Sequence, residues 1–136
     1  MEKPKSPIVM VDGLIIEEGR VLMQKRNHPP FVGCWVLPGG HHDCGETVEQ
    51  AVIREMKEEL DILVTIEKLF GVYSDPKRDP RYCTVTLVFL LKKGKGKIKI
   101  DRESSEFRFF PLEKLPRKIG FDHKQIINDF KRTRTK

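Results

Sequence analysis

The sequence predicts an α/β fold in which helices flank a mixed β-sheet. Short apolar segments bounded by glycine, proline and charged residues recur along the chain, and two longer segments, near 47–60 and 121–132, space their apolar residues with a helical period. Strands interrupted by two helices are typical of a sheet with helices packed on its faces. Because a chain of 136 residues suits one hydrophobic core, we expect a single domain over residues 1–136.

Strands are expected where β-branched, leucine and aromatic residues are bounded by turn residues. The polar turn "EEGR" separates the first two apolar segments, which predicts that they pair as a β-hairpin. The expected strands cover residues 7–16, 20–26, 34–37, 62–74, 82–91, 97–100 and 106–110.

The first predicted helix covers residues 47–60. Thr47 is its expected N-cap, and Gln50, three residues later, completes a capping box. The side chains that we expect to be buried recur every four residues, at Val48, Val52, Met56 and Leu60.

The second predicted helix covers residues 121–132, and we expect Asp122 and Gln125 to cap its start. A short helical turn is expected between two prolines at 111–116. The inward face of the second helix is expected to consist of Ile126, Ile127 and Phe130.

Composition limits the class of protein and the kind of ligand. Hydrophobic residues make up 38% of the chain and charged residues 34%, and no apolar run approaches the roughly 18 residues of a membrane span. We therefore expect no membrane partner. The net charge of +6 favours anionic ligands such as phosphates. Lysines concentrate at 92–99, but no aromatic residues are interleaved, so a nucleic-acid partner is not expected. Three cysteines and no export signal predict reduced thiols and a cytoplasmic location.

The segment "REMKEELD", residues 54–61, crowds three glutamates onto one side of the first helix. Glu55, Glu58 and Glu59 stand at i, i+3 and i+4, within roughly 100° of arc, and we expect them on an exposed face. Like charges at this spacing cost about 0.2–0.5 kcal/mol per pair. A solvated charged helix is the ordinary explanation. However, the glycine-rich stretch "LPGGHHDCGET" precedes this helix, and carboxylates facing a backbone loop are ligands that suit Mg²⁺.

The spacing of these residues resembles the Nudix box. Gly40, Glu46 and the run 54–59 match glycine-x5-glutamate-x7-arginine-glutamate-apolar-x-glutamate-glutamate. Asp61 replaces the final glycine, which often adopts a left-handed conformation that aspartate tolerates. The resemblance extends to "FVGCWVLPGG" and "FRFFPLEKLP". It implies an α/β/α sandwich around a mixed sheet and an enzyme that hydrolyses a nucleoside diphosphate linked to another group, using Mg²⁺ or Mn²⁺.

The resemblance implies roles for individual residues of the box. Arg54 would pair with Glu46 or a neighbouring glutamate and orient it. The backbone at Gly39 and Gly40 would contribute to the metal and phosphate sites. The metal ligands would be Glu55, Glu58 and Glu59.

The resemblance also implies a general base after the box. Glu103 and Glu106 are the candidates, and Glu106 is preferred slightly because it lies closer to a predicted strand. Each of them also fits a solvated loop acid. Glu55 or Glu59 is the alternative base.

The loop "DPKRDPR", residues 75–81, resembles a group of ADP-ribose pyrophosphatases. That resemblance implies ADP-ribose as the substrate, with AMP and ribose 5-phosphate as products. Arg78 and Arg81 would either grip phosphates through their forked donors or stiffen the loop by pairing with Asp75 and Asp79.

Further residues are assigned by their positions. Arg26, at the end of a predicted strand, is a phosphate candidate, and His41, beside the glycines, is a substrate contact. Trp35 would either stack on an adenine or belong to the core. Cys83 is expected in the core and His123 on a helix surface.

Two other functions are consistent with the box. A hydrolase of oxidised dGTP or of dinucleoside polyphosphates would share it, so that only substrate kinetics separate these enzymes. A non-catalytic domain that senses a nucleotide and binds nucleic acid through the basic tail is the second alternative. The complete set of glutamates argues against it. Pyrophosphatases of the resembling kind are often dimers, so a homodimer is also an expectation.

Overall fold

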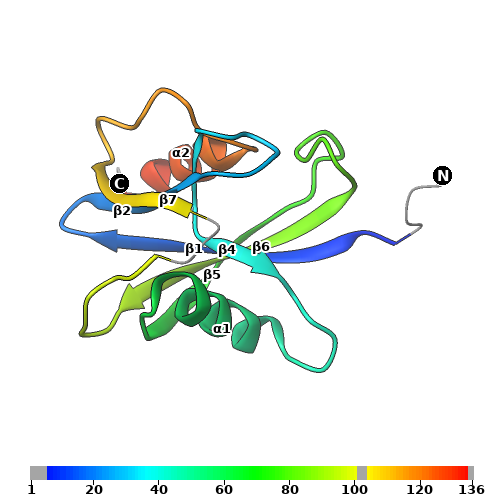
Figure 1. Ribbon diagram of the computed structural model, residues 1–136, viewed down its shortest axis with the longest axis horizontal. Helices are drawn as coiled ribbons and strands as arrows, with labels where there is room; N and C mark the ends of the chain where they lie inside the picture. Colours follow the sequence, from blue (N-terminus) through cyan, green and yellow to red (C-terminus); the bar gives the residue numbers. More distant parts are fainter. Residues whose placement is uncertain (1–5, 101–103, 135–136) are drawn as a thin grey trace.

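The computed structural model describes residues 6–100 and 104–134. Within these residues, seven strands and two helices follow one another along the chain (Figure 1). The elements are β1 (Ile8–Glu17), β2 (Arg20–Arg26), β3 (Trp35–Val36), β4 (Gly39–His41), α1 (Val48–Leu60), β5 (Val64–Tyr73), β6 (Thr84–Lys93), β7 (Ser104–Pro111) and α2 (His123–Thr133).

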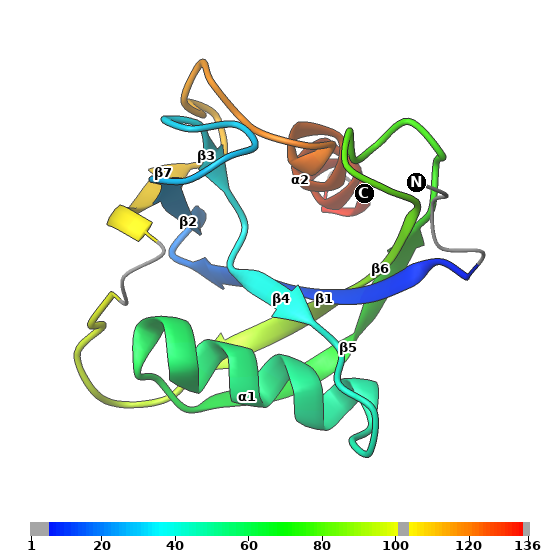
Figure 2. The same ribbon diagram turned by 45° about the vertical axis from the view of Figure 1, so that its right-hand side comes forward.

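The strands form a mixed sheet, as the sequence predicts. The order is β3-β2-β1-β6-β5, with β4 on β1 and β7 on β2. β1 runs parallel to β6 from Ile8↔Thr84 to Ile15↔Leu91, and the other pairs are antiparallel. The predicted β1–β2 hairpin is confirmed, but its recorded pairing covers only the two residue pairs nearest the turn. Beyond them the strands diverge, and β1 pairs with β4 while β2 pairs with β3 (Figure 2).

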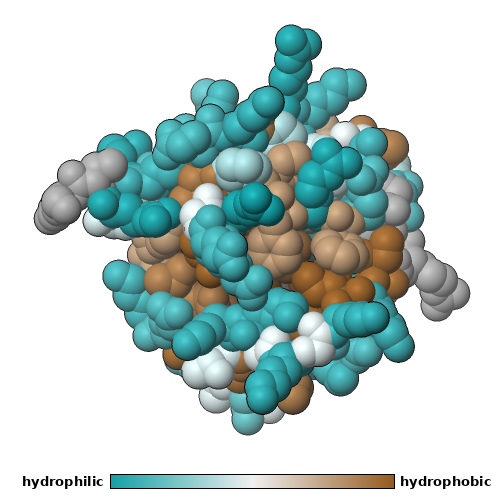
Figure 3. All heavy atoms as spheres, turned by 90° about the vertical axis from the view of Figure 1, so that its left-hand side faces the viewer, coloured by the Kyte–Doolittle hydropathy of each residue, from teal (hydrophilic) through white to brown (hydrophobic). Residues whose placement is uncertain are grey.

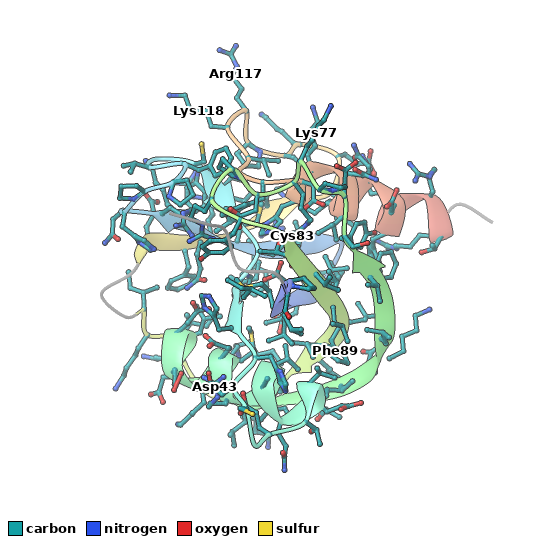
Figure 4. The ribbon with its side chains drawn as sticks, turned by 90° about the vertical axis from the view of Figure 1, so that its right-hand side faces the viewer. Asp43, Lys77, Cys83, Phe89, Arg117 and Lys118 are labelled. Carbon is teal, nitrogen blue, oxygen red and sulfur yellow. The ribbon has the colours of Figure 1, made fainter. Side chains whose placement is uncertain are left out.

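The two helices cover opposite faces of the sheet (Figures 1 and 2). Because successive side chains of a strand point to opposite faces, β1 contributes to two separate cores. Val11 and Ile15 belong to the cluster that packs against α1, whereas Leu14 belongs to the cluster that packs against α2. Figure 4 shows Phe89 of β6 on the α1 side. This arrangement confirms the predicted sandwich.

The distribution of hydrophilic and hydrophobic residues on the surface follows the helix and sheet layers of the fold. Viewed from the side of the β1–β2 turn, hydrophilic residues cover the α1 and α2 layers, and hydrophobic residues gather at the height of the sheet (Figure 3). In the part of the chain that the structure describes, no helix combines the length and the apolar character needed to cross a membrane.

α1 begins and ends as its sequence predicts. The Thr47 hydroxyl accepts a hydrogen bond from the backbone N–H of Gln50, and the Gln50 side chain accepts one from Thr47, which completes the capping box. Asp61 ends the helix in the left-handed region, with φ 56° and ψ 39°. Its carboxylate pairs with Lys57 at 2.6 Å, and this pairing lowers the Asp61 pKa.

Two predicted elements are wrong. Residues 97–100 form no strand, because the backbone N–H of Lys99 donates to the carbonyl of Leu60 at the end of α1 rather than to a neighbouring strand. The segment 111–116 turns without forming a helix. The strand β4 was not expected, because glycines disfavour strands in general.

The predicted cap of α2 is also wrong in its chemistry. Asp122 occupies the N-cap position, but its side chain makes no capping hydrogen bond. Both carboxylate oxygens instead accept hydrogen bonds from Arg78, at 2.9 and 2.7 Å. The inward face of α2 is confirmed, since Ile126, Ile127 and Phe130 are buried.

Candidate active site

A cavity of about 240 Å³ lies where β1 and β2 diverge. Residues of β1, β2, β4, both helices and the β5–β6 loop line it. The divergence creates the cavity because side chains of separated strands no longer fill the space between them. Several predicted site residues line this cavity, namely Arg26, Gly39, Gly40, His41, Glu59, Arg78 and Arg81.

The glutamate face of α1 is less exposed than expected. Glu59 is only 7% exposed, and the Glu55 side chain is 13% exposed, whereas the Glu58 side chain remains 56% exposed. The expectation of an exposed face is therefore wrong for Glu55 and Glu59. The reason is that β4 lies against this side of α1, and the backbone N–H of Gly39 donates to Glu59 Oε1 at 2.9 Å.

Arg54 links the acidic residues of the box. Its Nε and Nη2 donate to the two oxygens of Glu46 at 3.0 and 2.8 Å, which is the predicted pairing. Its Nη1 donates to Glu55 at 3.1 Å and to Glu58 at 2.8 Å, and Nη2 also reaches the carbonyl of His41 at 2.9 Å. One guanidinium thus holds three carboxylates and the backbone of β4 together.

The pKa values of Glu46 and Arg54 follow from this geometry. The hydrogen bonds from Arg54, helped by the backbone N–H of Asp43, lower the pKa of Glu46 from 4.5 to about 2. The same hydrogen bonds raise the pKa of Arg54 above its ordinary value. Glu46 therefore stays ionised and Arg54 stays charged across the physiological range.

The residues of this face suit a divalent cation by their chemistry. Carboxylate oxygens are the ligands that Mg²⁺ and Mn²⁺ prefer. A β-carbon at Gly40 would overlap the carboxylate of Glu55, so only glycine lets the backbone approach this close. With Arg54 held between Glu55 and Glu58, the described residues present no group of three His, Cys, Asp or Glu side chains already arranged around one point.

A buried Asp–His pair forms one wall of the cavity. The backbone N–H of Leu37 donates to His123 Nδ1 at 2.9 Å, so this nitrogen carries no proton. His123 Nε2 lies 3.1 Å from Asp12 Oδ2 and is therefore the nitrogen that donates to it. His123 is 4% exposed, so the expectation of a surface position is wrong. The second oxygen of Asp12 lies against Gly39, where a β-carbon would overlap it.

The two arginines of the 75–81 loop make internal contacts. Arg78 is buried, and besides Asp122 its Nη1 donates to the hydroxyls of Thr84 and Thr86 at 2.7 Å each. Arg81 donates to Asp79 at 3.1 and 2.9 Å, as one of the two alternatives predicted. Burial raises the pKa of Asp79, but the hydrogen bonds from Arg81 outweigh it and the net pKa is lowered. The side chain of Arg78 pairs with Asp122 and not with the Asp75 carboxylate. Asp75 stabilises the turn instead, because its carbonyl accepts from the backbone N–H of Arg78 and its carboxylate from that of Lys77.

Phe121 joins two cations at the rim of the cavity. The guanidinium carbons of Arg26 and Arg81 lie 5.3 and 5.7 Å from the centre of its ring. Arg26 also donates to the carbonyl of Pro30 at 2.6 Å. Phe121 has a φ of 53°, which is rare for a bulky residue. Figure 4 shows that Lys77, Arg117 and Lys118 project from the same side of the molecule as α2, which makes this side cationic.

Other predicted residues lie away from the cavity. Trp35 belongs to the core on the α2 side and packs edge-on against Phe110, so the core alternative is the one observed. Glu106 is paired with Lys25 at 3.8 Å and Arg108 at 3.3 Å, and it does not line the cavity. Glu103 lies outside the described residues. Cys83 precedes β6 and is exposed, so its predicted core position is wrong.

Asp12, Gln24 and His123 are among the cavity residues that were not predicted from the sequence. Asp12 and Gln24 interrupt the apolar strands "PIVMVDGLII" and "RVLMQKR", and both are buried. A polar residue inside an apolar strand is a usable signal, because burial without a partner is costly. His123 gave no such signal, since it follows the polar start of a helix.

Comparisons with known proteins agree with this geometry. A family model described as the NUDIX domain matches residues 7–130. The chain is 47% identical over 126 residues to an ADP-ribose pyrophosphatase from Methanocaldococcus jannaschii, covering 93% of this chain and 74% of that protein. The crystal structure of a MutT NUDIX hydrolase from Burkholderia pseudomallei is 30% identical with a TM-score of 0.84, covering 91% of this chain and 98% of that one.

A second solved structure contains ligands. It is a bifunctional NMN adenylyltransferase/ADP ribose pyrophosphatase from Francisella tularensis complexed with AMP and a Mn ion. It is 30% identical with a TM-score of 0.79, and the match covers 97% of this chain but 42% of that one. The family model, the relative and both folds point the same way, and this chain belongs to the Nudix hydrolase family.

Proposed function

We propose that this chain is a pyrophosphohydrolase that uses Mg²⁺ or Mn²⁺ and acts on ADP-ribose. The observation that carries the proposal is the glutamate face of α1 lying against Gly39 and Gly40 at the edge of the cavity. The relative named ADP-ribose pyrophosphatase supports the choice of substrate. We also propose a cytoplasmic location, which is consistent with three free cysteines.

The cation would be held by Glu55, Glu58 and Glu59, with the backbone at Gly39 beside them. When bound, a divalent cation neutralises a pyrophosphate and lowers the pKa of bound water. Arg54 orients the crowded carboxylates, because it pairs with Glu55 and Glu58 and is itself fixed by Glu46. A cation would take over part of this charge neutralisation.

A carboxylate of α1 also serves as the general base in this proposal. Glu59 lines the cavity and is held by the Gly39 N–H, and Glu55 is the alternative. Glu106 is a weaker candidate because its carboxylate pairs with Lys25 and Arg108. The base takes a proton from the attacking water, whose oxygen forms a new bond to one phosphorus of the anhydride. The bond from that phosphorus to the bridging oxygen breaks, and AMP and ribose 5-phosphate leave.

The cationic side of the molecule attracts the anionic substrate. Arg26 and Arg81 lie at the cavity rim around Phe121, where they face incoming phosphates. Arg78 acts differently in this proposal, since four of its hydrogen bonds are internal. It positions the 75–81 loop and α2 rather than holding phosphate directly.

The substrate proposal is tested by measuring AMP release with Mg²⁺ from ADP-ribose, NADH and diadenosine tetraphosphate, and hydrolysis of 8-oxo-dGTP in parallel. We expect ADP-ribose to have the highest kcat/KM. A higher kcat/KM for another of these compounds would leave the glutamate mechanism intact and would contradict ADP-ribose as the substrate. Metal binding without hydrolysis of any member, together with salt-dependent binding to DNA, would favour the non-catalytic alternative.

The metal proposal predicts that Glu58→Gln and Glu59→Gln each reduce kcat/KM by about 10³-fold, since a lost ligand removes several kcal/mol of charge stabilisation. The far-UV circular dichroism spectrum should not change, because glutamine keeps the size of the side chain. Glu49→Gln, exposed on the first turn of the same helix, is the matched control and should retain activity. An active double variant would contradict the assignment of these ligands.

A further inference from the structure

Gln24 carries a buried amide without a hydrogen-bond partner. The residue is 3% exposed, and its Nε2 atom makes no hydrogen bond to any residue that the structure describes. An amide N–H group buried without an acceptor costs stability. Gln24 lines the cavity, so an acceptor on a molecule bound beside it would satisfy this donor.

The fold explains why this donor has no partner. Gln24 lies on β2 opposite Val36 of β3, beyond the point where β2 leaves β1. Two other polar side chains of the cavity are used within the protein. Thr86 accepts from Arg78, and His123 bonds to both Leu37 and Asp12. Asp12 also lines the cavity, and it can accept a further hydrogen bond because a carboxylate retains lone pairs after accepting one.

The size and the lining of the cavity limit what it can hold. Its volume of about 240 Å³ is below the roughly 300–1,000 Å³ of pockets for drug-sized ligands, so it accommodates part of a substrate rather than all of ADP-ribose. A ribose would present hydroxyls to walls that are partly apolar. The apolar lining consists of Met10, Val36, Leu37 and Phe121.

We propose that Gln24 is the specificity-determining residue for the nucleobase, donating from Nε2 to a ring nitrogen of adenine while Asp12 accepts from the 6-amino group. This inference rests on the proposed function, because adenine is the base of ADP-ribose. On the edge formed by N1 and the 6-amino group, adenine presents an acceptor nitrogen next to an amino donor, and a glutamine amide N–H can donate to that nitrogen. Hypoxanthine reverses the pattern, since its N1 carries a proton and its 6-position is an acceptor.

If the unsatisfied amide of Gln24 serves a ligand, its removal should not lower the melting temperature of the ligand-free protein. Gln24→Met preserves the length of the side chain and removes the amide. The ligand-free variant should therefore have the same or a higher melting temperature than the wild type, whereas a purely structural glutamine would lower it when replaced. Gln24→Leu is a second variant with the same expectation if methionine packs poorly.

The binding experiment uses the full chain with Mg²⁺ and titrates AMP and IMP by calorimetry. Neither nucleotide contains the anhydride, so binding is measured without turnover. We expect the wild type to bind AMP about tenfold more tightly than IMP, and Gln24→Met to lose about tenfold for AMP with little change for IMP. Gln125→Met, an identical substitution on the exposed side of α2, is the matched control and should behave as the wild type.

Each outcome has a distinct meaning. Equal AMP affinity in the wild type and Gln24→Met overturns the inference, as does an absence of preference for AMP over IMP. Failure of AMP to bind a chain that hydrolyses ADP-ribose also overturns it. Selective loss of AMP binding in Gln24→Met, in a protein that does not hydrolyse ADP-ribose, supports the inference and rejects the proposed substrate.

Discussion

Arg54 shows how one side chain can organise an acidic surface. Glu55 and Glu58 are separated by one helical turn and would repel each other, but both accept hydrogen bonds from the same guanidinium. Glu46, from the preceding loop, fixes the other edge of that guanidinium. A lysine would not replace this arginine, because its point charge lacks the planar fork that reaches several acceptors at once.

The Glu46–Arg54 contact predicts a pH dependence of stability. The folded-state pKa of Glu46 is about 2, below the ordinary value of 4.5, so its contribution to stability is complete above pH 4.5 and is lost as the pH falls toward 2. In metal-free protein, Glu46→Gln should lower the free energy of unfolding at neutral pH, and the difference from the wild type should shrink over this interval. Urea denaturation at several pH values measures it, with Glu49→Gln as a control. A difference that stays constant below pH 4.5 would contradict the prediction.

Helix α1 is the element whose sequence is most informative. Its cap and its end depend on residues close in sequence, so both were predicted correctly. Of its predicted buried positions, Val52, Met56 and Leu60 are confirmed, whereas Val48 is only partly buried. The burial of Glu59 was not predicted, because it depends on β4, which lies about 20 positions earlier in the chain. Asp122 illustrates the same limit for α2. Its usual capping role is replaced by Arg78, which is 44 positions away.

The end of α1 makes a prediction about Asp61. Because its φ is 56°, Asp61→Val should destabilise the protein by about 1–2 kcal/mol relative to Asp61→Gly, which adopts this conformation without steric cost. Both variants lose the ion pair with Lys57, so their comparison isolates the backbone effect. Chemical denaturation measures the difference. Equal stabilities would mean that the left-handed conformation at this position is not retained.

At the scale of the whole molecule, two cores share one sheet. Met56 of α1 and Ile126 of α2 belong to different clusters, which are separated by the strands β1, β2 and β6. Because each of these strands contributes side chains to both clusters, we propose that the chain unfolds as one domain. The cavity with Asp12 and Gln24 lies where the strands β1 and β2 of this shared sheet diverge.

This arrangement predicts that a destabilising substitution in one core also shifts the unfolding transition of the other core. Met56→Ala and Ile126→Ala should each cost about 2–5 kcal/mol, the range for truncations of large core side chains. Trp35 is the only tryptophan and belongs to the α2 side, so its fluorescence reports on that core. In Met56→Ala, the fluorescence and far-UV circular dichroism transitions should coincide and shift together. An unchanged Trp35 transition would show that the two layers unfold separately.

The sequence by itself determined most of the elements, the fold class and the acidic face of α1, because these depend on periodicity and on spacing within a short segment. It also left open the two roles of Trp35, which the structure then distinguished. Only the tertiary structure decided that Asp12, Gln24 and His123 meet in one cavity. The physical reason is that they come from three elements distant in sequence, and their meeting depends on where two strands stop pairing and on which face the second helix covers.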